Sequence, residues 1–219
     1  MRILVLDSAL ARRTAAIIAD DAVIALRTEA GKQGHETILP AMARDVMAEA
    51  GAGIDLVAVT VGPGSFTGIR ACLALGHGIG LGHGVPVVGV TVGEAIAVAF
   101  PHLGGRDMWV VTESRRGYIF LEQGVDIASL AIAALPEPRR PVAIAGAAAV
   151  QVASRLAARG VDVLLTDSRF PLPRHIARVA ARRHKGELSP RAAQPLYVDP
   201  PEARFPAGGL RPPPETLLR

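Results

Sequence analysis

The pattern of apolar and polar residues along this chain predicts a mixed α/β protein. Within residues 2–7, positions 3–6 are a continuous apolar run, which is typical of a strand buried on both faces. Residues 35–50 carry apolar side chains at helical spacing. The whole pattern predicts strands over 2–7, 14–19, 22–28, 55–61, 86–90, 108–113, 117–122, 142–146 and 161–165, and helices over 35–50, 68–83, 147–159 and 174–185.

The order of these elements predicts two lobes and a tail. Three leading strands followed by crossover helices make a mixed sheet. That order resembles the ribonuclease-H-like lobe shared by actin, Hsp70 and sugar kinases. The composition changes after Phe100. We therefore predict an N-terminal lobe over 1–100, a smaller C-terminal lobe over 101–190 and a proline-rich tail without regular structure over 191–219.

Composition narrows the possible functions. Cys72 is the single cysteine, which excludes an internal disulfide, and no paired cysteines suggest a zinc site. No apolar run reaches the length of about 18 residues that a membrane span needs, and the residues before Asp7 are too few for a signal peptide. We therefore expect a cytoplasmic protein that does not bind membranes.

Charge is concentrated at the C-terminal end. The formal net charge is +4, and residues 169–219 alone hold ten basic and four acidic residues. This excess has two readings: an RNA-facing patch, or a solvated helix face with its tail.

A glycine-rich loop after the strand at 55–61 is the strongest local signal. It consists of Gly62, Pro63, Gly64, Ser65, Phe66, Thr67 and Gly68. Ile69 stands where a Walker A loop has lysine, and Thr67 breaks a G-x-G-x-x-G pattern. A phosphate could bind the N–H groups that begin the next helix, or the glycines could serve only a tight turn.

The helix after this loop is rich in glycine, including Gly76, Gly78, Gly80 and Gly82. Each glycine inside a helix costs roughly 1 kcal/mol against alanine. Gly76 and Gly80 share one face with Leu73, so this face permits close approach of another element, either within the fold or between chains.

Catalytic and metal sites have little support. The histidines at 35, 77, 83, 102, 175 and 184 form no H-x-x-x-H pair, and Ser65 is outside the register of an esterase nucleophile. Asp7, followed by Ser8, could hold Mg²⁺ in an actin-like ATPase or be a hydrogen-bonded turn residue. We expect no catalytic residue, no metal and no cofactor.

The run from Val61 to Arg70 resembles the signature of the TsaB (YeaZ-type) family. Further agreement spans about residues 1–205 and comprises Asp7-Ser8, His35 with Leu39-Pro40, Val88-Gly89-Val90, Arg115-Arg116-Gly117 with Tyr118, and Pro195-Leu196-Tyr197-Val198 with Pro200-Pro201. Two positions differ from the family pattern: Glu36 replaces the family's serine or alanine, and Tyr118 stands earlier in the hairpin than the family's tyrosine.

This resemblance implies an actin-like (ribonuclease-H-like) fold of two lobes with mixed sheets flanked by helices. It also implies a noncatalytic subunit that supports the catalytic paralogue TsaD together with the ATPase TsaE. Their complex transfers a threonylcarbamoyl group from its adenylate to N6 of adenosine 37 in tRNA. The implied partners are TsaD, TsaE or a second copy of the chain, with tRNA contacted only indirectly.

One departure from the paralogue bears on catalysis. TsaD carries a His-x-x-x-His metal motif after the strand matching 87–90, and Val92 and Ile96 stand at those positions here. Valine and isoleucine cannot bind a metal.

The family's dimer surface is formed by the helices that flank the glycine loop. It implies a partner surface of His35, Leu39, Met42, Val46, Arg70, Leu73, Gly76, His77 and Gly80. The alternative is an actin-like ATPase or small-molecule kinase with nucleotide between the lobes, near Asp7, Ser8 and Gly62–Gly64. A metallopeptidase, an older label for the superfamily, is opposed by the missing histidines.

Overall fold

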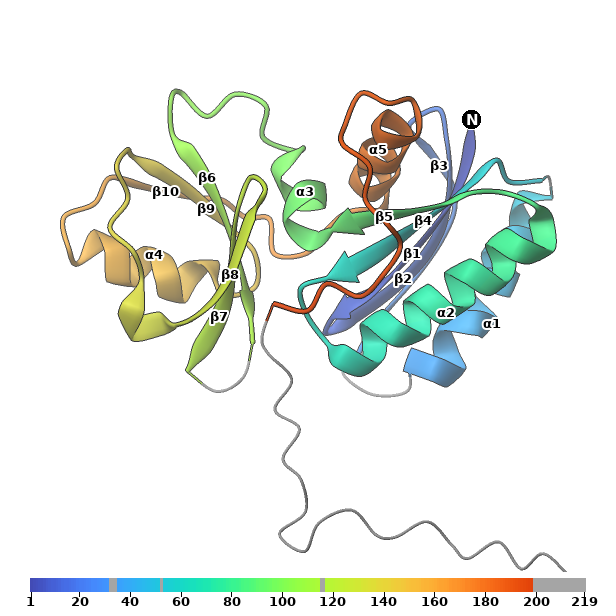
Figure 1. Ribbon diagram of the computed structural model, residues 1–219, viewed down its shortest axis with the longest axis horizontal. Coiled ribbons are helices and arrows are strands. Elements are labelled where there is room, and N and C mark those ends of the chain that lie inside the picture. Colours follow the sequence, from blue (N-terminus) through green and yellow to red (C-terminus); the bar gives the residue numbers. More distant parts are fainter. Residues whose placement is uncertain (32–34, 52, 115–116, 199–219) are drawn as a thin grey trace, which may run out of the picture.

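The computed structural model contains two five-stranded sheets that lie side by side, each with helices packed against it (Figure 1). It describes residues 1–31, 35–51, 53–114 and 117–198. Arg115 and Arg116 of the predicted hairpin, and Pro200-Pro201 with the rest of the tail from residue 199, lie outside the described residues.

The first sheet is mixed, as the sequence predicts. Its order is β3-β2-β1-β4-β5, with β1 antiparallel to β2 and parallel to β4. The strands are β1 (Arg2–Leu10), β2 (Arg12–Ala19), β3 (Ala22–Ala30), β4 (Leu56–Gly62) and β5 (Val87–Thr91).

Helices cover both faces of this sheet because β1 is apolar on both sides. Leu4 and Leu6 point into a core beneath α1 (His35–Ala50) and α2 (Phe66–His83). Ile3 and Val5 point the other way, into a core shared with α5 (Pro173–His184). A continuous apolar strand therefore fixes a three-layer lobe.

The second sheet repeats the arrangement of the first, in the order β10-β9-β6-β7-β8. Its elements are β6 (Asp107–Glu113), β7 (Tyr118–Gln123), β8 (Asp126–Ala131), a short 3-10 helix (Ile132–Ala134), β9 (Val142–Ala145), α4 (Ala149–Ala157) and β10 (Val163–Leu165). The core on its α4 face includes Trp109 and Leu156. Two mixed sheets flanked by helices confirm the predicted actin-like fold class.

Helix α5 packs on the first lobe, although the predicted boundaries assign it to the second. The sequence reading placed residues 101–190 together, but Ile176 and Ala180 of α5 pack against the first sheet. Helix α5 covers the face of that sheet opposite α1 and α2 (Figure 1). The pattern also gave no indication of the short helix α3 (Val92–Ala97), which lies between the lobes, or of strand β8.

Residues 191–198, which we call the C-terminal strap, are packed against the first lobe. The N–H of Gly89 donates to the Arg191 carbonyl (3.3 Å), and the N–H of Leu196 donates to the Val61 carbonyl (2.9 Å). Ala193 is buried. The strap has no helix or strand, yet one of its backbone hydrogen bonds is with the edge strand β5, at Gly89, and the other is with the end of β4, at Val61.

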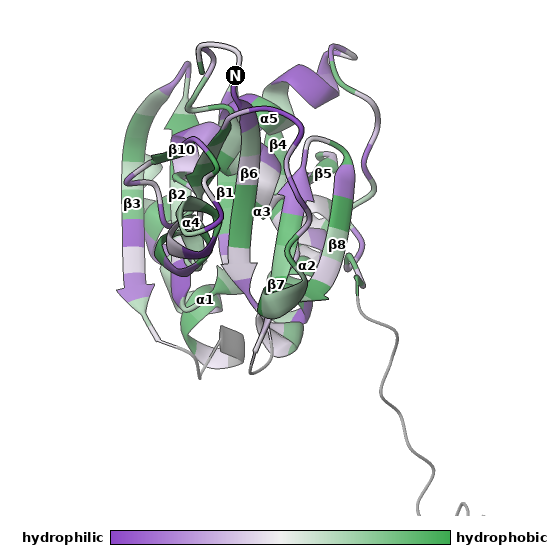
Figure 2. Ribbon diagram, turned by 90° about the vertical axis from the view of Figure 1, so that its left-hand side faces the viewer, coloured by the Kyte–Doolittle hydropathy of each residue, from purple (hydrophilic) through white to green (hydrophobic). Residues whose placement is uncertain are grey.

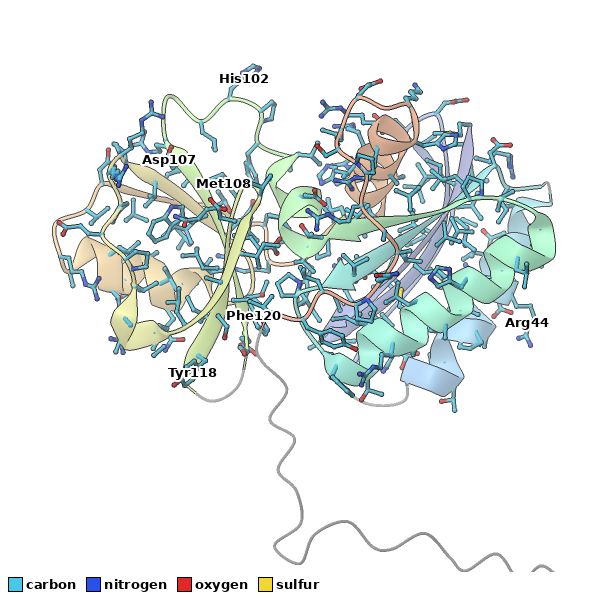
Figure 3. All side chains as sticks on the ribbon, in the orientation of Figure 1. Arg44, His102, Asp107, Met108, Tyr118 and Phe120 are labelled. Carbon is cyan, nitrogen blue, oxygen red and sulfur yellow. The ribbon has the colours of Figure 1, made fainter. Side chains whose placement is uncertain are left out.

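Hydrophobic residues are prominent along the strands of both sheets, whereas the C-terminal end of β3 is hydrophilic (Figure 2). Within the described residues, no helix is both long and apolar enough to cross a bilayer.

The glycines of α2 give a matched stability test. A Cβ at Gly76 would lie 2.5 Å from Val59 Cγ1, whereas a Cβ at Gly78 would meet nothing within 4 Å. We expect Gly76→Ala to destabilise the fold by roughly 1–3 kcal/mol through overpacking. Gly78→Ala should stabilise it by about 1 kcal/mol through helix propensity. Urea unfolding measures both, and equal shifts in the same direction would contradict the packing argument.

Candidate functional site

The glycine loop is pressed against the bend between β1 and β2. The N–H of Ser65 donates to the Ala9 carbonyl (2.7 Å), and Ser8 Oγ donates to the Gly68 carbonyl (2.7 Å). A Cβ at Gly64 would overlap Ala9, and one at Gly68 would overlap the Ser8 carbonyl. Both glycines are therefore required by close backbone approach.

The same contacts argue against a phosphate on this loop. Ser65 caps α2, and its side chain accepts the Gly68 N–H (3.2 Å). The N–H of Ser65 is bound to Ala9. Two donors that an anion would need are thus already occupied inside the chain, so the tight-turn reading fits the geometry better than phosphate binding.

Asp7 is buried and hydrogen-bonded within the first lobe. Its Oδ1 accepts from Thr60 Oγ1 (2.7 Å) and from the N–H of Ala9 (3.1 Å). A carboxylate enclosed in this way does not fit the role of an open Mg²⁺ ligand beside a nucleotide. Among the described residues, no group of three or more His, Cys, Asp or Glu side chains could hold a metal ion.

The two positions that carry histidine in the paralogue are apolar and enclosed. Val92 and Ile96, both on α3, are fully buried. They belong to the same core as Leu6 of the first sheet and Val110 of the second. This part of the interlobe region is therefore filled by hydrocarbon rather than by ligating groups.

Helix α2 has two faces with different environments. Its inner side, with Leu73, Gly76 and Gly80, packs on the first sheet. From α1, the side chains of Leu39, Met42 and Val46 are likewise buried in the core. These six predicted interface residues thus pack within the chain, and close approach at Gly76 and Gly80 is to strands β4 and β5.

The outer side of α2 is exposed and carries the remaining predicted residues. Arg70 and His77 lie on it, and His77 Nε2 is 2.7 Å from the strap carbonyl of Ala193. Leu81 on the same side is 87% exposed. The side chain of His35 lies outside the described part of the chain.

An aromatic cluster marks the first turns of α2. The Arg70 guanidinium carbon lies 3.3 Å from the Phe66 ring centroid, and Arg70 Nη2 donates to Tyr197 Oη at 2.7 Å. Phe66 and Tyr197 remain 61% and 60% exposed. The cluster is therefore both solvent-facing and held in place by its own contacts. Tyr197 belongs to the C-terminal motif, and nothing in that motif indicates its contact with α2.

These features define a class: an actin-like two-lobe protein whose glycine loop and first-strand carboxylate are closed by internal contacts. Residues 27–128 match the family model described as TsaD, tRNA N6-adenosine threonylcarbamoyltransferase.

Relatives narrow the class further. The chain is 30% identical over 124 residues to the tRNA threonylcarbamoyladenosine biosynthesis protein TsaB of Escherichia coli, covering 55% of this chain and 53% of that protein. An uncharacterized protein of Mycobacterium bovis is 32% identical over 158 residues, covering 66% and 72%. The match therefore spans only about half of the E. coli protein.

Solved structures share the fold. YeaZ from Pseudomonas aeruginosa superposes with a TM-score of 0.71 at 21% identity, over 90% of this chain and 99% of that one. The ethanolamine utilization protein EutJ from Carboxydothermus hydrogenoformans reaches 0.50 at 14% identity, over 81% and 89%. The chain is therefore similar in sequence to a TsaB protein and shares the fold of YeaZ.

Cys72 offers a test of how closed the centre of the first lobe is. It lies on the inner side of α2 and is fully buried, and burial together with the nearby Asp7 charge raises the pKa of its thiol to about 12. We expect a disulfide reagent at pH 8 to modify the native protein roughly 10³-fold more slowly than the urea-unfolded chain. Comparable rates in the two states would show that this region opens readily.

Proposed function

We propose that this chain is a noncatalytic subunit of the machinery that forms N6-threonylcarbamoyladenosine in tRNA, and that it supports a TsaD-type catalytic paralogue working with TsaE. The sequence similarity to E. coli TsaB supports a role in this tRNA modification pathway. The noncatalytic role is supported by one observation above all: Val92 and Ile96 are buried apolar residues where the paralogue has metal-binding histidines.

The exposed side of α2 is the surface we propose for the paralogue. Arginine and tyrosine are enriched among residues that dominate binding energy, particularly when they are rigid before binding. Arg70 and Tyr197 meet that description, because each is fixed by the other and by Phe66. Leu81 extends the surface toward the end of the helix.

Reconstitution tests the function directly. Purified TsaD and TsaE, with threonylcarbamoyl-adenylate and a tRNA transcript, should modify the tRNA only when this chain is added. The chain alone should give no product, because it lacks the paralogue's metal ligands. Equal product with and without the chain would remove it from this pathway.

Charge reversal tests the surface. Arg70→Glu breaks the contacts with Phe66 and Tyr197 and should weaken binding to TsaD by about 2 kcal/mol, or roughly 30-fold in Kd. Isothermal calorimetry gives the constant. The matched control is Arg155→Glu, an exposed site on α4 of the other lobe, which should bind as the wild type does. Equal losses for both variants would count against a surface centred on α2.

A further inference from the structure

Glu122 reaches from the second sheet to a helix of the first lobe. It lies on β7, and its Oε1 accepts the N–H of Gly93 on α3 at 2.7 Å. The residue is only 3% exposed, and its Oε2 is buried without a hydrogen-bond partner among the described residues. This is a direct polar contact between the lobes, made by an ionisable group.

The contact between Glu122 and α3 requires glycine at position 93. A Cβ at Gly93 would lie 2.5 Å from both Cδ and Oε2 of Glu122. A glycine at this position therefore lets the carboxyl group sit against the α3 backbone. Figure 1 shows α3 between the two sheets, at the place where such a contact can control their approach.

Helix α3 itself is anchored firmly in the first lobe. Thr91 and Glu94 form a capping box at its start. Glu94 Oε1 accepts from Arg183 Nη2 on α5 (2.6 Å), and Arg183 Nη1 donates to the Gly89 carbonyl on β5 (2.8 Å). Loss of the Glu122 contact would therefore loosen the second sheet against α3, where the apolar contacts of Val92 and Ile96 with Val110 remain, rather than release α3 from its own lobe.

The charged groups around Glu122 act on its ionised form in opposite directions. Glu94 on α3 repels the ionised carboxylate, and Arg191 on the strap attracts it. On its own sheet the facing residues are apolar: Val110 on β6 and Ile127 on β8 are its partners in the two ladders. The attraction by Arg191 and the hydrogen bonds with Thr91 and the Gly93 N–H offset only part of the cost of burying a full negative charge.

We propose that the Glu122–Gly93 contact is a protonation-controlled latch between the lobes: the neutral carboxyl group holds them together, and its ionisation favours their separation. The inference rests on this contact alone and stands apart from the proposed role in tRNA modification.

The direction of the pH effect follows from burial. Burial raises the pKa of Glu122 from 4.5 to about 7, and the repulsion by Glu94 adds to it, although Thr91 and the Gly93 N–H oppose the shift. In an open form the carboxyl group would be hydrated and its pKa would return toward the ordinary value. The closed form is therefore fully favoured below pH 4.5, and this preference is lost as the pH rises through 7. The ratio of open to closed molecules should rise by up to roughly 10²-fold.

The test uses the full chain, read out by hydrogen exchange and small-angle X-ray scattering at pH 5.5 and 8.5. In the wild type, exchange at the Gly93 amide, corrected for its intrinsic pH dependence, should accelerate at pH 8.5, and the radius of gyration should grow. Glu122→Gln keeps the acceptor oxygen but cannot ionise, so both quantities should then stay constant. Glu137→Gln, on an exposed loop, is the control and should behave as the wild type does.

A carboxyl-carbon NMR titration completes the test, since it follows Glu122 itself. A midpoint near 7 that coincides with the change in exchange is the expected result. The latch is overturned by identical pH dependence in wild type and Glu122→Gln, by a wild type that does not change, or by a Glu122 midpoint near 4.5.

Discussion

The close contact between the glycine loop and the first hairpin is the constraint on which the first lobe depends. The loop can touch the bend at Ser8 and Ala9 only because Gly64 and Gly68 have no side chains. That contact fixes where α2 begins, and the glycines of the inner helix face then set how near α2 lies to the sheet. The loop resembles a phosphate-binding loop in composition, but the N–H groups of Ser65 and Gly68 already donate hydrogen bonds within the chain.

The inner side of α2 therefore packs on the sheet, while its outer side faces solvent. Glycines on the inner side are explained by contact with Val59 and Val87, while a Cβ at Gly78 or Gly82 would meet nothing within 4 Å among the residues that the structure describes. The predicted interface combined inner residues such as Gly76 with outer residues such as Arg70, so only part of it lies on the surface. The proposed surface is narrower, and it gains the strap, which brings Tyr197 to Arg70.

The fold class could be predicted from the sequence because the continuous apolar run at 3–6 and the helical spacing over 35–50 are strong local signals. It missed α3, since six residues are too few to show a helical period, and it missed the destination of α5, since the pattern of a helix does not say which sheet receives it. At the candidate site, Arg70 followed from its place in a motif. Its contact with Tyr197, 127 positions away, and the burial of Glu122 depend on tertiary packing that no local pattern encodes.

The position of α5 and the strap has a consequence for how the protein is synthesised. The first hundred residues supply all five strands of the first sheet. One layer of its core is completed only by Ile176 and Ala180 of α5, and the edge strand β5 gains its hydrogen bond to the strap only after that. Such distant pairings are slow to form. A nascent chain still held by the ribosome therefore carries an apolar sheet with one bare face, so the first lobe is begun first and completed last.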